Sequence, residues 1–179
     1  MGMFELKSLS KETIPAALNK AERYRFLGEP VEAESICLDI LDVEPDNEKA
    51  LITLILALTD QFGQRQNPNA FKEALDSVSR LKDDYNKAYY TGIIYERRAK
   101  AHLNQPVPGA GHVAYGWFAK AMEFFEKAIA ISPAGNEDAI LRWNTCARIQ
   151  IRNPSVSPQP ETVETTIMDD DPSGPWRKR

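Results

Sequence analysis

The window Ile14–Asn47 limits the possible folds more than any other part of the chain, because it has the spacing of two short packed helices. The small residues Ala21 and Ala33 fall one on each helix, Gly28 marks the turn between them, and Pro45 follows Ala33 by twelve residues. Two antiparallel helices approach closely where a small side chain faces a bulky one, and a proline stops the second helix. The window therefore predicts a helical hairpin.

A second copy of this pattern lies further along the chain, divided by an insertion. Gly92 stands in one helical run, and Ala121 precedes Pro133 by twelve residues in the next. We expect Gly92 to receive an aromatic side chain from the neighbouring helix. The stretch Glu48–Tyr85 between the two copies has the spacing of a third hairpin but no closing proline, so it is the weakest match.

These patterns resemble the tetratricopeptide repeat family, strongly in the first and third units and weakly in the second. As a whole the chain looks like a bacterial protein of this repeat type. The resemblance implies an all-α fold, a right-handed α-solenoid of about three hairpins plus a C-terminal capping helix. The expected parts are a lead at 1–13, units at about 14–47, 48–84 and 85–135, and a capping helix at 136–151.

Hydrophobic periodicity predicts seven helices and no strand. Their expected ranges are 14–27, 30–43, 48–62, 69–83, 85–103, 113–132 and 136–151. The longest apolar stretch, Leu51–Leu58, is much shorter than the roughly 20 residues of a membrane span. The first thirteen residues carry charges without an extended apolar core, so no secretory signal is expected. We therefore expect a cytoplasmic protein that does not insert into a membrane.

Two linkers and the C-terminal segment depart from the tight turns of the family. The linkers are Gly63–Asn69 and Asn104–His112, and they are either tolerated surface loops or part of a binding surface. The segment Asn153–Arg179 holds five prolines, the acidic run Asp169–Asp171 and a basic end, a composition that predicts a disordered tail. Its Pro175–Trp176 end is a solvated terminus or a short docking motif.

The sequence contains no motif for catalysis or for holding a cofactor. We expect neither catalytic residues, nor a metal site, nor a cofactor, because no phosphate loop, dinucleotide fingerprint or metal-ligand spacing is present. Cys37 and Cys146 each fall within an amphipathic helix, and we expect both to pack as small apolar side chains. The formal charge of −4 and the pI near 5.3 disfavour nucleic-acid binding.

The family resemblance implies that the first helices of successive repeats line a concave groove for a peptide or a helix. The positions carried over are Leu18, Glu22, Arg25 and Phe26 in the first unit, Ile52, Leu56, Thr59 and Asp60 in the second, and Tyr89, Ile93, Glu96 and Arg97 in the third. If the last helix continues the array, Ile140, Asn144 and Arg148 join them. The alternative is that the apolar members are simply core, because one sequence does not fix helix rotation.

One subclass of the family grips a terminal carboxylate with cations at fixed groove positions. Those positions hold Leu18, Glu22, Thr53, Asn86 and Tyr90 in this chain. Since none is Lys or Arg, a carboxylate clamp of that type is not expected. The mixture of apolar and charged positions favours an amphipathic helix or an apolar peptide with a charged rim.

The sequence thus predicts a noncatalytic interaction module or scaffold with a protein or peptide partner. The alternative is an enzyme, or an enzyme-accessory subunit, whose site is formed by the inserted loops. Self-association is a third possibility, because repeat arrays can stack end to end when a cap is incomplete.

Overall fold

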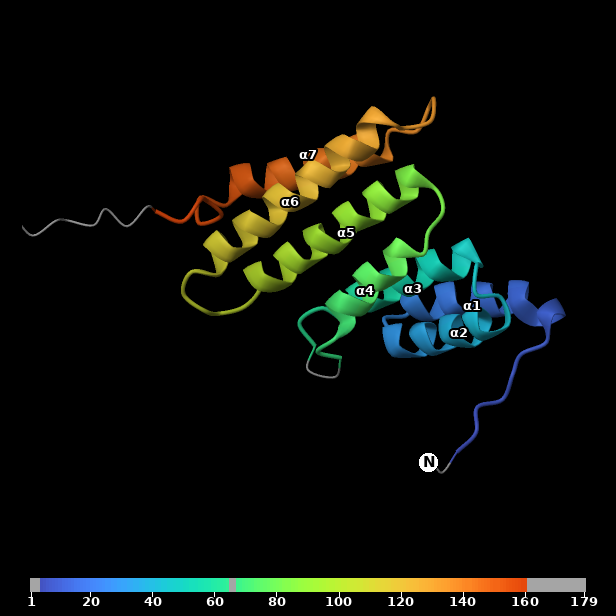
Figure 1. Cartoon of the computed structure of the whole chain (residues 1–179). Coiled ribbons are helices and arrows are strands. Elements are labelled where there is room, and N and C mark those ends of the chain that lie inside the picture. The colour runs from blue at the N-terminus through green and yellow to red at the C-terminus, as the bar shows by residue number, and fades with distance from the viewer. Residues whose placement is uncertain (1–3, 65–66, 161–179) are drawn as a thin grey trace, which may run out of the picture.

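The computed structural model describes residues 4–64 and 67–160 of the chain. Over these two ranges the regular elements are all helical (Figure 1), which confirms the all-α class. The α-helices are α1 (Ile14–Phe26), α2 (Pro30–Val43), α3 (Glu48–Asp60), α4 (Ala70–Ser79), α5 (Asp84–Leu103), α6 (Ala110–Ala130) and α7 (Asp138–Arg152), and a short 3-10 turn, η1 (Lys11–Thr13), leads into α1. In the described part, no helix is long and apolar enough to cross a membrane.

The ends of the helices follow from local capping chemistry. The side chain of Asn47 accepts a hydrogen bond from the Ala50 amide at 3.0 Å, and Asp83 caps α5 in the same way. Two predicted boundaries differ by three or four residues. Helix α4 ends at Ser79 rather than at 83, because the chain must become extended before Asp83 can cap α5. Helix α6 begins at Ala110 rather than at 113, because Gly109, with φ of 80°, forms the left-handed turn directly before it.

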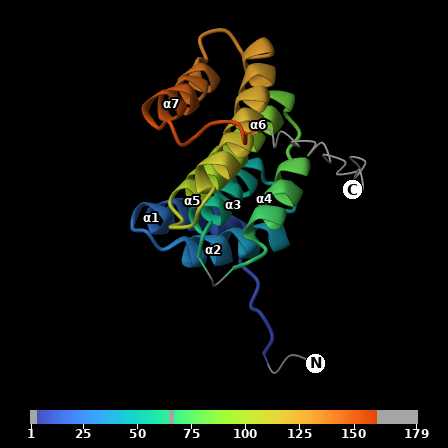
Figure 2. The same ribbon diagram turned by 90° about the vertical axis from the view of Figure 1, so that its left-hand side faces the viewer.

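The helices pack in chain order. Each helix contacts the next one, and α1, α3, α5 and α7 also contact one another in succession. One apolar core lies among α1 to α4 and reaches Ile94 of α5, and a second lies among α5, α6 and α7. Figures 1 and 2 show these two groups of helices beside each other. The odd-numbered helices are therefore connected by direct contacts from α1 through α3 and α5 to α7.

The predicted close approach at Gly92 is confirmed. A Cβ placed on Gly92 would lie only 2.5 Å from Cε1 of Phe125, which is fully buried on α6. Helices α5 and α6 can therefore lie this close only because residue 92 has no side chain. Ala21, the small residue of the first unit, is also fully buried.

Both cysteines lie within the apolar cores, as expected. Cys37 of α2 and Cys146 of α7 are free thiols with no exposed surface. Burial is the main cause that raises the pKa of each thiol to about 12. They are small apolar side chains rather than nucleophiles.

The segment after α7 differs from the predicted disorder where the structure describes it. Val156 is 5% exposed and packs on the α5–α7 core, and the carbonyl oxygen of Ser157 lies 2.9 Å from Nδ1 of His112. The Ser155 carbonyl approaches Gly111 closely, and a Cβ at position 111 would clash with it. Figure 2 shows this segment running from α7 across to α6. The rest of the predicted tail, with Pro175–Trp176, lies outside the described residues.

Candidate functional site

The predicted groove positions lie on the four helices that contact one another in succession. We call the side formed by α1, α3, α5 and α7 the odd-helix face. Its predicted members differ in exposure. The exposed members are Glu22, Phe26, Ile140 and Arg148. The half-buried members are Leu18, Arg25, Ile52, Leu56, Asp60, Tyr89, Arg97 and Asn144. The buried members are Thr59, Ile93 and Glu96. The core alternative therefore applies to the last three, which cannot contact a partner in this conformation.

A first set of ion pairs connects α1, α3 and α5 across this face. Asp60 of α3 accepts a hydrogen bond from Nε of Arg25 at 2.8 Å, and its other carboxylate oxygen pairs with Arg97 of α5. Arg97 also donates to the Thr59 hydroxyl at 2.9 Å. The two arginine side chains and the carboxylate keep between 14% and 26% of their surface exposed. One carboxylate thus pairs with two guanidinium groups, and all three groups remain partly exposed to solvent.

A second set of ion pairs connects α5 and α7. Glu96 has no exposed surface, and its carboxylate pairs with Lys100 one helical turn further along α5. Its Oε2 atom lies 3.4 Å from Nε of Arg142 on α7, and has no hydrogen-bond partner within the described ranges. Lys100 and Arg142 retain 38% and 29% of their surface. A buried carboxylate is favourable only when cations compensate it, so this pair fixes α7 against α5.

The two sets together carry more positive than negative charge. We call them the charge ladder, and its members are Arg25, Asp60 and Arg97 in the first set and Lys100, Glu96 and Arg142 in the second. Four cations hold two carboxylates, so the ladder itself has two more positive than negative charges, in a chain whose formal charge is −4. Guanidinium groups that share one carboxylate keep N–H donors free for a second carboxylate.

Apolar side chains lie on the same helices as the charge ladder. Ile52 and Leu56 on α3 are half-buried, as is Tyr89 on α5, whose ring stacks on Tyr85 with centroids 5.7 Å apart. Burial is the main cause that raises the pKa of the Tyr89 hydroxyl, and the Arg142 charge opposes the rise. At the α1 end, Phe26 is 85% exposed. The face therefore offers charged donors beside apolar contact area.

Comparison with known proteins adds no family or relative. No protein-family model, curated protein or solved structure matches this chain. The residues themselves are therefore the basis for assigning a function.

Two ladder members were not among the predicted groove positions. Lys100 follows Glu96 by four residues, a spacing that places both on one side of α5 and could have suggested the pair. Arg142 has no such signal, because its contact with Glu96 depends on how α7 rotates and slides against α5. The clamp positions Thr53, Asn86 and Tyr90 hold no cation, as the sequence already showed.

The inserted loops offer less chemistry than the odd-helix face. Residues 104–109 are exposed, and Ala110, Gly111 and His112 of the second linker belong to the first turn of α6. In the first linker, residues 65–66 lie outside the described ranges. Across the residues that the structure does describe, no three His, Cys, Asp or Glu side chains gather as metal ligands would.

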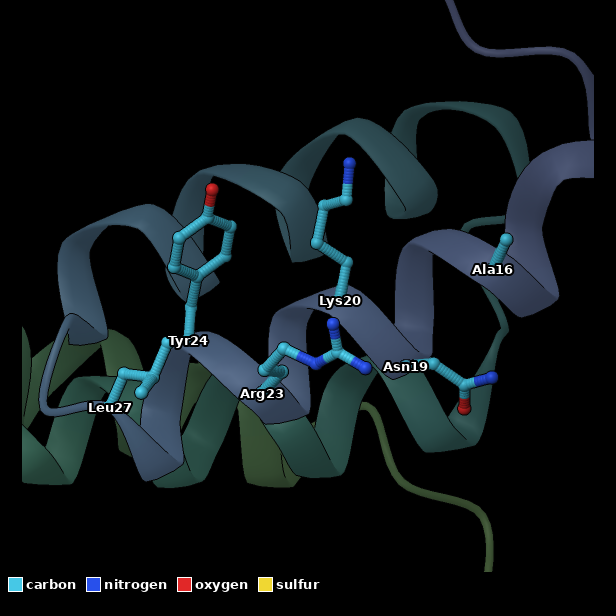
Figure 3. A pocket seen from close by; sticks show the side chains of 6 residues that line it. All are labelled: Ala16, Asn19, Lys20, Arg23, Tyr24 and Leu27. Carbon is cyan, nitrogen blue, oxygen red and sulfur yellow. The ribbon is translucent and has the colours of Figure 1, made fainter.

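A pocket lies along α1 in the first hairpin. Figure 3 shows its lining side chains, which come from α1 and from the residue that follows it, Leu27: Ala16, Asn19, Lys20, Arg23, Tyr24 and Leu27. Leu27 is 65% exposed, and the lining includes neither a carboxylate nor a thiol. Because a single helix and its cap residue supply the lining, the pocket has less converging chemistry than the charge ladder.

Proposed function

We propose that this protein is a noncatalytic interaction module that binds an acidic peptide or helix along the odd-helix face. The observation that carries the proposal is the charge ladder, in which four cations share two carboxylates. An incoming Asp or Glu side chain would satisfy donors that Asp60 and Glu96 leave free. The half-buried apolar residues on the same helices, Ile52, Leu56 and Tyr89, would take apolar side chains of the same ligand.

We further propose that the array is a tetratricopeptide-like α-solenoid whose concave side is the odd-helix face. The order of helix contacts supports this, because α1, α3, α5 and α7 touch in succession while each also packs on its chain neighbours. In such an array α7 stands as the first helix of an incomplete unit. Its exposed Leu141 and Ile151 are consistent with that place at the end of the array.

The ligand would differ from that of the carboxylate-clamp subclass. The cations that would bind it come from Arg25, Arg97, Lys100 and Arg142 rather than from the clamp positions, and they are spread over three helices. A ligand matched to them carries several acidic side chains along its length instead of a single terminal carboxylate. We expect a free C-terminus on the peptide to make little difference to its affinity.

Selection from a displayed library of random peptides tests the proposal. We expect the recovered peptides to be rich in Asp and Glu next to apolar residues. Arg97→Gln should weaken their binding about tenfold, since a hydrogen bond to a charged group contributes roughly 1.5–3 kcal/mol. The matched control is Lys72→Gln, which removes an exposed cation from α4 and should leave binding unchanged.

The same experiment separates the proposal from the loop-site alternative. Replacing the exposed residues Gln105–Pro108 by a Gly-Ser segment of equal length should leave peptide binding intact. Recovery of peptides without acidic enrichment, or equal binding by wild type and Arg97→Gln, would contradict the odd-helix assignment. Loss of binding on the loop replacement alone would favour a site at the second linker.

A further inference from the structure

A group of aromatic rings lies on a different side of the molecule, where α4, α5 and α6 meet. Phe71 of α4 makes edge contacts with Tyr95 of α5 and with Trp117 of α6, at centroid distances of 5.9 and 5.5 Å. Tyr95 stacks between Trp117 and Phe124, at 5.7 and 5.6 Å. All four side chains are half-buried, so one part of each ring stays accessible.

Cations border these rings. The Arg98 guanidinium lies 5.1 Å from the centre of the Phe71 ring, and the Lys120 ammonium lies 5.6 Å from that of Tyr95. Lys127 lies over Phe124 and pairs with Glu123 at 2.7 Å. Among the described residues no carboxylate pairs with Arg98 or Lys120, and the buried Nε of Arg98 has no hydrogen-bond partner.

We call this surface the aromatic–cation patch; its members are Phe71, Tyr95, Arg98, Trp117, Lys120 and Phe124. Arg98 and Lys120 give it two cations for which the described residues supply no ion pair, and the rings supply flat apolar area. Such a surface fits an extended segment with acidic and aliphatic side chains. Cation–π contacts hold the two cations in place without using their capacity to pair with carboxylates.

The described part of the chain ends near the start of α6, the helix that carries Trp117, Lys120 and Phe124 of the patch. The segment after α7 packs on the first turn of α6, through Ser155 against Gly111 and Ser157 against His112. Trp117 and Lys120 follow on the same helix within about two turns of His112. The next stretch of sequence, Glu161–Asp171, contains five acidic residues, no basic residue and the aliphatic residues Val163, Ile167 and Met168.

We propose that the acidic stretch Glu161–Asp171 docks in cis on the aromatic–cation patch. Eleven extended residues span about 36 Å, and α6 is about 31 Å long, so the stretch can follow α6 from His112 past Lys120. Its carboxylates pair with Lys120 and Arg98, and its aliphatic side chains cover the Trp117 and Phe124 rings. The proposal does not depend on the function of the odd-helix face, which lies on other residues.

Zero-length carbodiimide cross-linking of the full chain tests this contact, because the reagent joins a carboxylate to an amine only where the two touch. We expect peptide mapping to find Lys120, and to a lesser extent Lys127, linked to residues within Glu161–Asp171 in the monomer. Changing the five acids of the stretch to their amides should remove these links. The internal link of Lys127 to Glu123 should remain in that variant and is the control for an intact α6.

The possible results distinguish docking of the acidic stretch on the patch of its own chain from docking elsewhere or by a second copy. Links from the acidic stretch to Lys100 or Lys49 in place of Lys120 would overturn the proposal and place the stretch on the odd-helix face. Links confined to a cross-linked dimer would also overturn it, because they would mean a second copy supplies the stretch. No link between Glu161–Asp171 and any lysine, with the Lys127 to Glu123 link present, would equally reject the docking. None of these results depends on the outcome of the peptide selection.

Discussion

The contact between Gly92 and Phe125 gives the sharpest prediction about stability. A Cβ added at Gly92 would lie 2.5, 2.6 and 3.0 Å from three atoms of the Phe125 ring. Phe125 is fully buried between α5 and its neighbours, so the ring has no adjoining open space to enter. Gly92→Ala must therefore separate α5 from α6 or push the ring out of its rotamer.

Two opposing effects set the size of the change. Replacing glycine by alanine within a helix stabilises it by about 1 kcal/mol, whereas overfilling a packed core costs about 1–3 kcal/mol. The net expectation for Gly92→Ala is a loss of about 1 kcal/mol in the free energy of unfolding. Gly116→Ala is the matched control, because Gly116 lies within α6 and a Cβ there meets nothing within 4 Å. The free energy of unfolding of Gly116→Ala should rise by about 1 kcal/mol.

Thermal unfolding followed by circular dichroism measures both variants. At this chain length, 1 kcal/mol corresponds to a shift of about 2–4 °C in melting temperature, so the two variants should move in opposite directions. Adding Phe125→Leu to Gly92→Ala should cost less than the sum of the single changes, since a smaller side chain makes room for the Cβ. If Gly92→Ala stabilised the protein as much as Gly116→Ala does, the close approach of α5 and α6 would be refuted.

Two further predictions concern buried groups. Glu96→Gln should destabilise the protein by about 2 kcal/mol in urea denaturation, because Lys100 and Arg142 lose their charged hydrogen-bond acceptor. Glu123→Gln, at an exposed pair, should have a much smaller effect, and equal effects would contradict the buried ion pairs. In the native protein, Cys37 and Cys146 should not react with an aromatic disulfide reagent at pH 8, because burial raises the pKa of each thiol to about 12. Both thiols should react once the protein is unfolded. Rapid reaction of either thiol in the native protein would contradict their burial.

Much of the helical order was predictable because it depends on local chemistry. Side-chain spacing and turn residues located the seven α-helices of the described residues, with the largest errors at the end of α4 and the start of α6. Those errors arose where a cap outside the helix decides the boundary, at Asp83 and at Gly109. The docking of Val156 was missed because prolines around it gave the whole segment the composition of a disordered tail.

The candidate site was less predictable because its contacts join different helices. Family positions placed Arg25, Asp60 and Arg97 on one face, and the structure pairs all three. Nothing in the spacing of residues says that Glu96 is buried or that Arg142 reaches it, since both depend on the rotation of α7 against α5. The aromatic–cation patch was missed for the same reason: its rings come from three helices that are far apart in sequence.

The most direct test of the charge ladder as a binding surface is the affinity of one selected acidic peptide for wild type and for Arg97→Gln at low and at high salt. We predict that wild type binds about tenfold more tightly at low salt and that the difference shrinks at high salt, where the screening length falls from about 10 Å at 0.1 M to about 3 Å at 1 M. Equal affinities of the two proteins at low salt, with both folded, would contradict the account.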